Sequence, residues 1–313
     1  MPVSVSAPGK IYLCGEHFVV YGAPALLSAI DKRVTVKIED HKDKLLTYSL
    51  DNRFIRHIIN VVKNHFALRS IRPFKITVAS QIKKGYHLGS SAAVSVASIG
   101  ALLYYLKRVW NPDLVNKLAF EVEKIKHHNA SGADNSGITY GGLVWYRKEL
   151  EFLKSIWQLS LKIPSNLNKF YLIDTGTPLE STAAMVKFVA KKYAENKRFF
   201  DRFMAINEIQ TKKIALALKE GNANNLVNAL KVCENTLEKI GVVSQKVIPI
   251  IREVEKKGGA AKILGGGGRS KGVGYLLCFI AGETLLPDLV KRYNFSLEAI
   301  SLGEEGIRLE SSK

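Results

Sequence analysis

Cysteine is scarce in this sequence, and the three that occur, Cys14, Cys233 and Cys278, are far apart and odd in number. No C-x-x-C pair is present, so the spacing implies neither a disulfide framework nor a zinc knuckle. A few scattered cysteines are typical of proteins that work in a reducing compartment. We therefore expect a cytoplasmic protein.

Long hydrophobic runs are also rare. Residues 85–106 carry no Lys, Arg, Asp or Glu, and a run of that length could span a bilayer. The run opens with glycines and serines, however, and contains Ser95, Ser98 and Gly100, so we interpret it as a helix buried between layers of a soluble fold. The first ten residues, MPVSVSAPGK, lack a basic region followed by an apolar one, so we expect no signal peptide and no membrane partner.

Negative charge is in short supply. There are 28 acidic residues against 46 basic ones, which gives a net charge of +18 and makes nucleic acid an obvious alternative partner. The lysines are nevertheless spread along the chain as solvated helix faces, with no basic tail, so we expect no nucleic-acid binding. A basic protein also concentrates substrates that carry several phosphates.

The 313 residues are 47% hydrophobic and 24% charged, as in ordinary globular proteins, and suffice for two domains. Alternating apolar residues predict strands at 3–6, 34–38, 74–78, 170–173 and 274–280. Helical spacing predicts helices at 51–65, 111–126, 185–203, 205–220, 225–240 and 244–257. Residues 7–10 and 127–135 are predicted as a turn and a polar loop. Charge and polarity rise at 147–154, which predicts domains 1–150 and 151–313.

The segment from Gly85 to Ala93 is the most informative stretch. It reads GYHLGSSAA and leads into a long uncharged helix pattern. Glycines let the backbone approach a ligand, and the first N–H groups of a helix attract anions. It is not a Walker A loop, because no Lys follows Gly89. A nucleotide phosphate site is our hypothesis; a tightly packed helix start without a ligand is the alternative.

Other residues supply what phosphoryl transfer needs. Lys10 follows Pro8-Gly9 and offers a cation, Gly265–Gly268 allow close backbone approach, and Glu123 and Asp134 supply carboxylates. Taken singly, Asp134 could form an Asx-turn and Glu123 could lie on a helix surface. His127 and His128 are adjacent, which makes a zinc site improbable.

Three blocks, in order, are similar to those of one family. They are residues 7–11 continuing to 15–22 (GEHFVVYG), residues 88–93 (LGSSAA), and residues 131–135 (SGADN) with Glu123 eleven positions before Asp134. On these blocks, the sequence resembles the mevalonate kinases of the GHMP kinase superfamily.

That resemblance implies a two-domain α/β (α+β) fold. The first domain would be ribosomal-protein-S5-like, the second a ferredoxin-like α+β domain, and the active site would lie in the cleft between them. The reaction implied is ATP-dependent phosphorylation of (R)-mevalonate at its 5-hydroxyl, with Mg²⁺, in isoprenoid biosynthesis. The partners are then ATP and mevalonate, and a homodimer is compatible with the family.

The resemblance also implies site residues. Asp134 and Lys10 would be catalytic, with Asp134 beside the acceptor hydroxyl and Lys10 stabilising the transferred phosphoryl group. Ser91 and Glu123 would hold Mg²⁺, while Glu16, His17 and Thr182 would lie on the substrate side. The nucleotide-binding segment would comprise Gly85, His87, Leu88, Gly89, Ser90, Ser91 and Ala92.

This chain departs from the family pattern in three places. Tyr86-His87 stands where the family has Ala-Gly, and His128 and Ala130 replace the Gly and Pro of His-Gly-x-Pro. The third motif, usually Thr-Gly-Ala-Gly-Gly-Gly, begins here with Leu264 and continues into Arg269 and Lys271. These changes bear on nucleotide affinity and feedback control more than on the reaction.

Two other functions are compatible with the sequence. Phosphomevalonate kinase or another small-molecule kinase of the superfamily would share the same motifs. A non-catalytic protein that binds nucleic acid or anions through its basic surface is more distant, because it leaves the carboxylate spacing unexplained.

Overall fold

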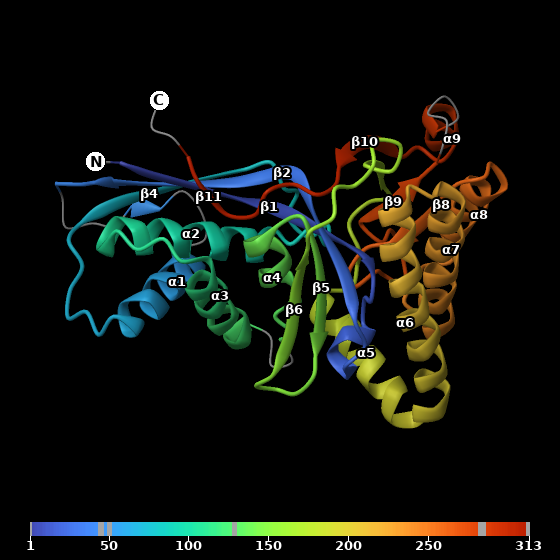
Figure 1. The fold of residues 1–313 in the computed structure, drawn as a ribbon, viewed down its shortest axis with the longest axis horizontal. Coiled ribbons are helices and arrows are strands. Elements are labelled where there is room, and N and C mark those ends of the chain that lie inside the picture. The colour runs from blue at the N-terminus through green and yellow to red at the C-terminus, as the bar shows by residue number, and fades with distance from the viewer. Residues whose placement is uncertain (1, 43–46, 49–51, 127–129, 281–285, 311–313) are drawn as a thin grey trace.

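The computed structural model describes residues 2–42, 47–48, 52–126, 130–280 and 286–310 (Figure 1). Within them, seven strands form one sheet: β1 (Val3–Cys14), β2 (Ala25–Asp40), β3 (Thr47–Tyr48), β4 (Phe74–Ser80), β5 (Leu143–Lys148), β6 (Lys154–Leu159) and β11 (Arg308–Leu309). The order is β11-β1-β2-β4-β3, and β5 joins the other end of β2, where Ala25–Ser28 pair with residues 143–146. The long β2 therefore connects two parts of the sheet.

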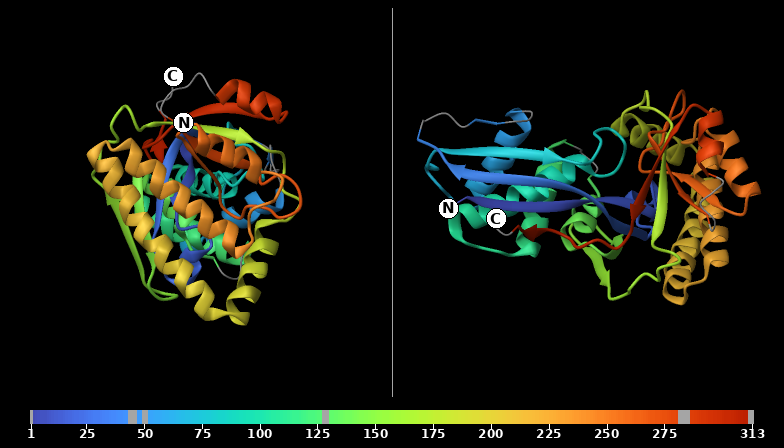
Figure 2. Two further views of the ribbon diagram at one scale, coloured as in Figure 1. Left: turned by 90° about the vertical axis from the view of Figure 1, so that its right-hand side faces the viewer. Right: turned by 90° about the horizontal axis from the view of Figure 1, so that it is seen from above.

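Helices cover one face of this sheet (Figure 2). They are α1 (Asn52–His65), α2 (Ser90–Lys107), α3 (Pro112–Lys126) and α4 (Ala133–Tyr140). Helix α2 packs along β1 and β2, and most of its side chains are buried because they are small or apolar all round. Within the described chain, none of the helices combines the length and apolar character that a membrane span requires.

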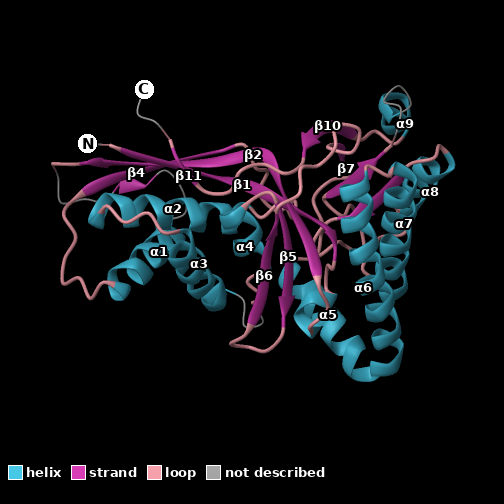
Figure 3. Cartoon of the chain, viewed as in Figure 1, coloured by secondary structure: helices cyan, strands magenta, loops and turns pink. Residues whose placement is uncertain are grey.

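The second half of the chain forms a smaller layered unit (Figure 3). In the described residues its sheet has four antiparallel strands in the order β10-β7-β9-β8, which are Ser296–Ser301, Lys169–Asp174, Tyr275–Phe279 and Ala260–Ile263. Its helices are α5 (Thr182–Glu195), α6 (Lys197–Glu220), α7 (Ala223–Ile240), α8 (Ile248–Lys256) and α9 (Leu286–Arg292). This mixed architecture confirms the predicted fold class.

Several local predictions were wrong. Residues 7–10 are not a turn: β1 runs straight through them with a shift in its pairing register between Pro8 and Gly9. The SGADN block is not wholly a loop, since α4 begins at Ala133 and carries Asp134 in its first turn. At residues 7–10 the pairing with β2 overrides the local turn signal of Pro and Gly, whereas at the SGADN block the helix begins directly after Gly132, which adopts a left-handed conformation.

The domain boundary at residue 150 remains a prediction. Strands on both sides of it belong to one sheet, because β6 pairs with β5. Strand β11, at the end of the chain, also returns to pair with β1.

The cysteine interpretation needs a correction. Cys14, at the end of β1, and Cys233, on α7, form a disulfide that bridges 219 positions of sequence, while Cys278 is a buried free thiol. Sequence spacing could not reveal this pair, because only the fold brings β1 and α7 together.

Candidate functional site

Lys10 and Asp134 form the centre of the site. Lys10 is almost fully buried, at 2% exposure, and its Nζ lies 3.2 Å from Asp134 Oδ1. The Tyr12 hydroxyl donates to the same oxygen at 2.9 Å. Burial and the Asp134 charge hold the pKa of Tyr12 well above its usual range, so the phenol stays a donor. The structure therefore places Lys10 and Asp134 side by side, as the sequence analysis expects.

The segment 85–91 is attached to Lys10 at two points. The Lys10 backbone N–H donates to Leu88 O at 3.0 Å, and Nζ donates to His87 O at 3.1 Å. Gly89 precedes α2 with φ +78°, and a Cβ there would lie 3.1 Å from Lys10 Cε. A glycine is therefore required, both for the backbone angle and for the room that Lys10 occupies.

A small pocket joins the predicted metal and catalytic residues. Ser91, Glu123 and Asp134 line it together, with Phe54, Ala92, Ser95, Val122 and Asn135. Glu123 Oε2 accepts a hydrogen bond from Asn135 Nδ2 at 2.9 Å. Burial, and then the charge of Asp134, raise the pKa of Glu123 to about 7. Two carboxylates facing one pocket beside a serine hydroxyl form an oxygen donor set that suits a hard cation.

Lys154 is a residue near this pocket that sequence reasoning missed. Its Nζ lies 2.9 Å from the centre of the Phe120 ring, and a Cβ on Gly132 would come within 3.0 Å of the same atom. Burial lowers the pKa of Lys154 to about 8 although Glu123 attracts its positive charge. No motif marks this lysine, and only the pairing of β6 with β5 brings it here.

Glu16 is held in a buried ion pair. Its partner is Lys262 on β8, another residue that the sequence analysis did not select, and Lys262 also donates to Ile263 O at 2.8 Å. Burial raises the pKa of Glu16, and the Lys262 charge opposes that shift. The sequence did contain a signal for Lys262, because a lysine stands there within an apolar strand pattern just before four glycines. The role of Glu16 in binding substrate remains a prediction.

His17 and Thr182 both face the Gly265–Gly268 loop. His17 Nε2 lies 3.3 Å from Gly266 O, and burial lowers the pKa of this histidine to about 4. Thr182 is the first residue of α5, and its Cα would be 3.4 Å from a Cβ at Gly266. Thr182 Oγ1 lies 3.5 Å from His87 Nδ1, which connects the second half of the chain to the segment 85–91.

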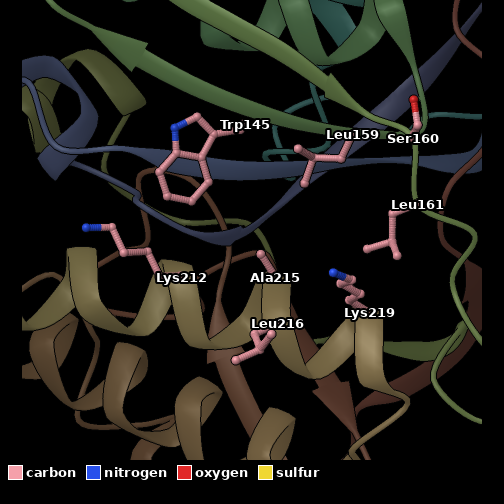
Figure 4. Close-up of a pocket in the computed structure, with 8 residues that line it drawn as sticks. All are labelled: Trp145, Leu159, Ser160, Leu161, Lys212, Ala215, Leu216 and Lys219. Atoms are coloured by element: carbon pink, nitrogen blue, oxygen red, sulfur yellow. The ribbon is translucent and has the colours of Figure 1, made fainter.

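A second pocket lies elsewhere, between the β5–β6 hairpin and α6 (Figure 4). Trp145, Leu159, Leu161, Ala215 and Leu216 make it largely apolar, with Ser160, Lys212 and Lys219 completing its lining. None of the residues that the sequence predicts for catalysis lines this pocket.

Comparison with known proteins identifies the family. The family model described as "GHMP kinases N terminal domain" matches residues 53–142. The mevalonate kinase of Archaeoglobus fulgidus is 35% identical over 269 residues, which cover 84% of this chain and 88% of that protein. The fold and the site thus define a GHMP kinase. Within that class, the chain belongs to the mevalonate kinase family.

Solved structures share the whole fold. The crystal structure of Methanococcus jannaschii mevalonate kinase superposes with a TM-score of 0.78 at 23% identity and covers 96% of this chain and 98% of that one. A Streptococcus pneumoniae phosphomevalonate kinase, solved with phosphomevalonate and AMPPNP, gives 0.79 at 18% identity, covering 96% of this chain and 99% of that one. At these identities the likeness concerns the fold, which the two activities share.

Proposed function

We infer that this protein transfers the γ-phosphoryl group of ATP to the 5-hydroxyl of (R)-mevalonate, giving 5-phosphomevalonate and ADP, a step of isoprenoid biosynthesis. Membership of the mevalonate kinase family supports this activity. The observation that carries it is the convergence of Lys10, Asp134, Glu123 and Ser91, which come from four different elements.

Asp134 is the group that receives the acceptor hydroxyl. Its Oδ1 already accepts from Tyr12 and pairs with Lys10, which together fix the carboxylate in one orientation. Its other oxygen can accept the hydrogen of a substrate alcohol. Lys10 stabilises negative charge on the phosphoryl group during transfer, in a buried position where its charge acts strongly.

Glu123 and Ser91 are our proposed ligands for Mg²⁺. The pocket that they line with Asp134 fits the ion, because it offers a carboxylate and a hydroxyl. Burial and the Asp134 charge disfavour the ionised form of Glu123, and a bound cation would stabilise that form. A Mg²⁺ ion bound there with ATP would neutralise part of the negative charge of the phosphates.

The remaining predicted residues divide between nucleotide and substrate. Gly85, His87, Leu88, Gly89, Ser90, Ser91 and Ala92 run into the N-terminal turn of α2, which favours phosphate. Glu16, His17 and Thr182 are proposed for the mevalonate side. A homodimer and a cytoplasmic location also remain predictions.

Replacing Asp134 by Asn tests the function directly. We expect turnover of mevalonate to fall at least about 1,000-fold while ATP still binds, because the amide cannot accept the hydroxyl proton. The matched control is Asp113→Asn. Asp113 also accepts a tyrosine hydroxyl, from Tyr140 at 2.7 Å, but it lies on the exposed side of α3. Turnover of Asp134→Asn close to that of the unsubstituted protein would contradict the assignment.

A substrate panel distinguishes the nearest rival. ADP release is measured with mevalonate, phosphomevalonate and simple sugars in parallel. We expect mevalonate to be the preferred acceptor. A preference for phosphomevalonate would contradict this proposal and identify the protein as a phosphomevalonate kinase.

A further inference from the structure

Two departures from the family pattern meet in space at His87. The Tyr86 ring is buried against Tyr275 of β9, with ring centres 4.8 Å apart, and this anchors the segment 85–91 to the second sheet. The next residue, His87, has φ +64° and lies against the Gly265–Gly268 loop. Leu264, which begins that loop, is fully buried in the core and contributes no hydroxyl to the site.

The glycines of the third loop make room for the His87 imidazole. A Cβ on Gly265 would lie 2.7 Å from His87 Cβ, and one on Gly266 would lie 3.3 Å from His87 Cε1. The imidazole of the first loop is therefore packed against the third loop, whose Gly266 is 179 positions further along the chain.

The contacts of the ring select its tautomer. Gly266 N–H donates to His87 Nδ1 at 3.4 Å, and the Thr182 hydroxyl lies 3.5 Å from the same atom. Since Nδ1 is the acceptor, the proton of a neutral imidazole must be on Nε2. Burial, and then the Lys10 charge, lower the pKa of His87 to about 4, so the ring is neutral at physiological pH.

His87 Nε2 is a buried donor that lacks an acceptor. Among the described residues it has no partner at good hydrogen-bonding geometry, and the nearby Gly267 backbone is a polar group that partly opposes the fall in the His87 pKa. A buried N–H without an acceptor is unfavourable unless something else fills the place. The ring feels the charges of both Lys10 and Asp134, and its own carbonyl accepts from Lys10 Nζ. His87 therefore lies next to the catalytic residues.

We propose that His87 Nε2–H donates a hydrogen bond to a phosphate oxygen of the nucleotide and so connects the two glycine-bearing loops around the triphosphate. This rests on the proposed kinase function. It gives the chain a side-chain contact to phosphate at a position where the family pattern has glycine. The carboxylate of the acceptor substrate is the other anionic group near Thr182, and the experiment below separates the two.

Two substitutions of His87 isolate the donor. In His87→Asn the amide reproduces the Nδ1 side of the ring but does not reach the Nε2 position, and Asn tolerates a positive φ. In His87→Gln the amide nitrogen reaches the Nε2 position. His65→Gln, on the exposed last turn of α1, is the control. Binding of ATP and of ADP is measured by calorimetry in the full chain without mevalonate, and the KM for mevalonate separately.

We expect His87→Asn to weaken ATP binding about 10-fold or more, as for one hydrogen bond to a charged group, with the KM for mevalonate unchanged. His87→Gln should stay within about 3-fold of the unsubstituted protein. Unchanged ATP affinity in both variants, or equal loss in both, would overturn the proposal, because a packing role does not distinguish Nδ1 from Nε2. A rise confined to the KM for mevalonate would overturn it as well.

A spectroscopic measurement needs no stable variant. The ring nitrogens of the seven histidines are observed by ¹⁵N NMR, with titration of the nucleotide and then of mevalonate. The rings of His17 and His87 should both be neutral and protonated on Nε2, and we expect the Nε2 signal of His87 to shift on addition of ADP or ATP. Protonation on Nδ1, or a shift caused by mevalonate alone, would overturn the proposal. Because nucleotide binding is measured without an acceptor, failure of the wild-type protein to phosphorylate mevalonate would be a separate result.

Discussion

Lys262 and Glu16 form a fully buried ion pair that joins β8 of the second sheet to the chain just after β1. Their side chains are 0% and 1% exposed, and Lys262 also donates to Tyr12 O at 3.3 Å. The pair therefore ties the second half of the chain to the strand that carries Lys10.

Replacing Lys262 by Met should destabilise the protein strongly. Glu16 would remain buried without its partner, which costs about 3–5 kcal/mol of unfolding free energy. Urea unfolding measures the change. As a control, Arg292→Met removes an exposed partner of Glu253 and should cost less than about 1 kcal/mol. Similar costs for the two variants would show that the buried pair contributes no more than an exposed one.

Glu234, on α7, makes stability depend on pH. Burial raises its pKa to about 8, against the attraction of Lys262 and the hydrogen bond from Ile263 N–H, while Glu238 and Glu16 add to the rise. An acid whose pKa is raised by folding loses stability as pH increases from its unfolded value of about 4.5 towards 8. Glu234→Gln should therefore unfold at higher urea than the unsubstituted protein at pH 8, and at nearly equal urea at pH 5.

The control for this prediction is Glu220→Gln, an exposed carboxylate at the end of α6. It should leave the difference between pH 5 and pH 8 unchanged. If Glu234→Gln behaves as this control does, the carboxyl group of Glu234 is not the source of the pH dependence.

Gly89 should be necessary for turnover because it leaves room for Lys10. In Gly89→Ala the new Cβ would press on Lys10 Cε and Cγ at 3.1 Å, in addition to the strain of φ +78°. We expect turnover to fall about 10-fold or more, since a displaced cation stabilises the transition state poorly.

Gly258→Ala provides the matched comparison for Gly89. Its φ of +82° imposes the same backbone strain, about 1–2 kcal/mol, but no described atom lies within 4 Å of the added Cβ. Steady-state kinetics and urea unfolding of both variants separate strain from displacement. Equal turnover in the two would refute the steric explanation.

The Cys14–Cys233 disulfide should contribute substantially to stability. Closing a loop of 219 positions corresponds to about 5 kcal/mol in the chain-entropy description. Addition of a reductant should lower the urea midpoint, and the double variant Cys14→Ser/Cys233→Ser should no longer respond to it. Thiol titration of the denatured, unreduced protein should find one thiol, Cys278. Three thiols before reduction would contradict the bond.

Local sequence patterns were sufficient where the physical cause is itself local. The helix predicted to start at residue 111 forms there, and Asn111 caps it, because its side chain accepts from Leu114 N–H three residues later. The glycines of the segment 85–91 likewise predict positive φ, which Gly85 and Gly89 adopt. The motif spacing also identified Lys10, Asp134, Glu123 and Ser91, which come together.

Where long-range pairing decides the structure, the same patterns failed. Pro8 and Gly9 suggest a turn in isolation, yet pairing with β2 keeps them in β1. Lys154 and Lys262 look like ordinary lysines until β6 and β8 bring them next to carboxylates.

By itself, then, the sequence determined the fold class, the family and the residues that meet at the centre of the site, because these follow from periodicity and from motifs of adjacent residues. Tertiary structure alone decided the Cys14–Cys233 bond, the Lys262–Glu16 pair and the position of His87 between two loops. Each of these depends on distances between segments far apart in the chain, and those distances are set by packing of the whole molecule.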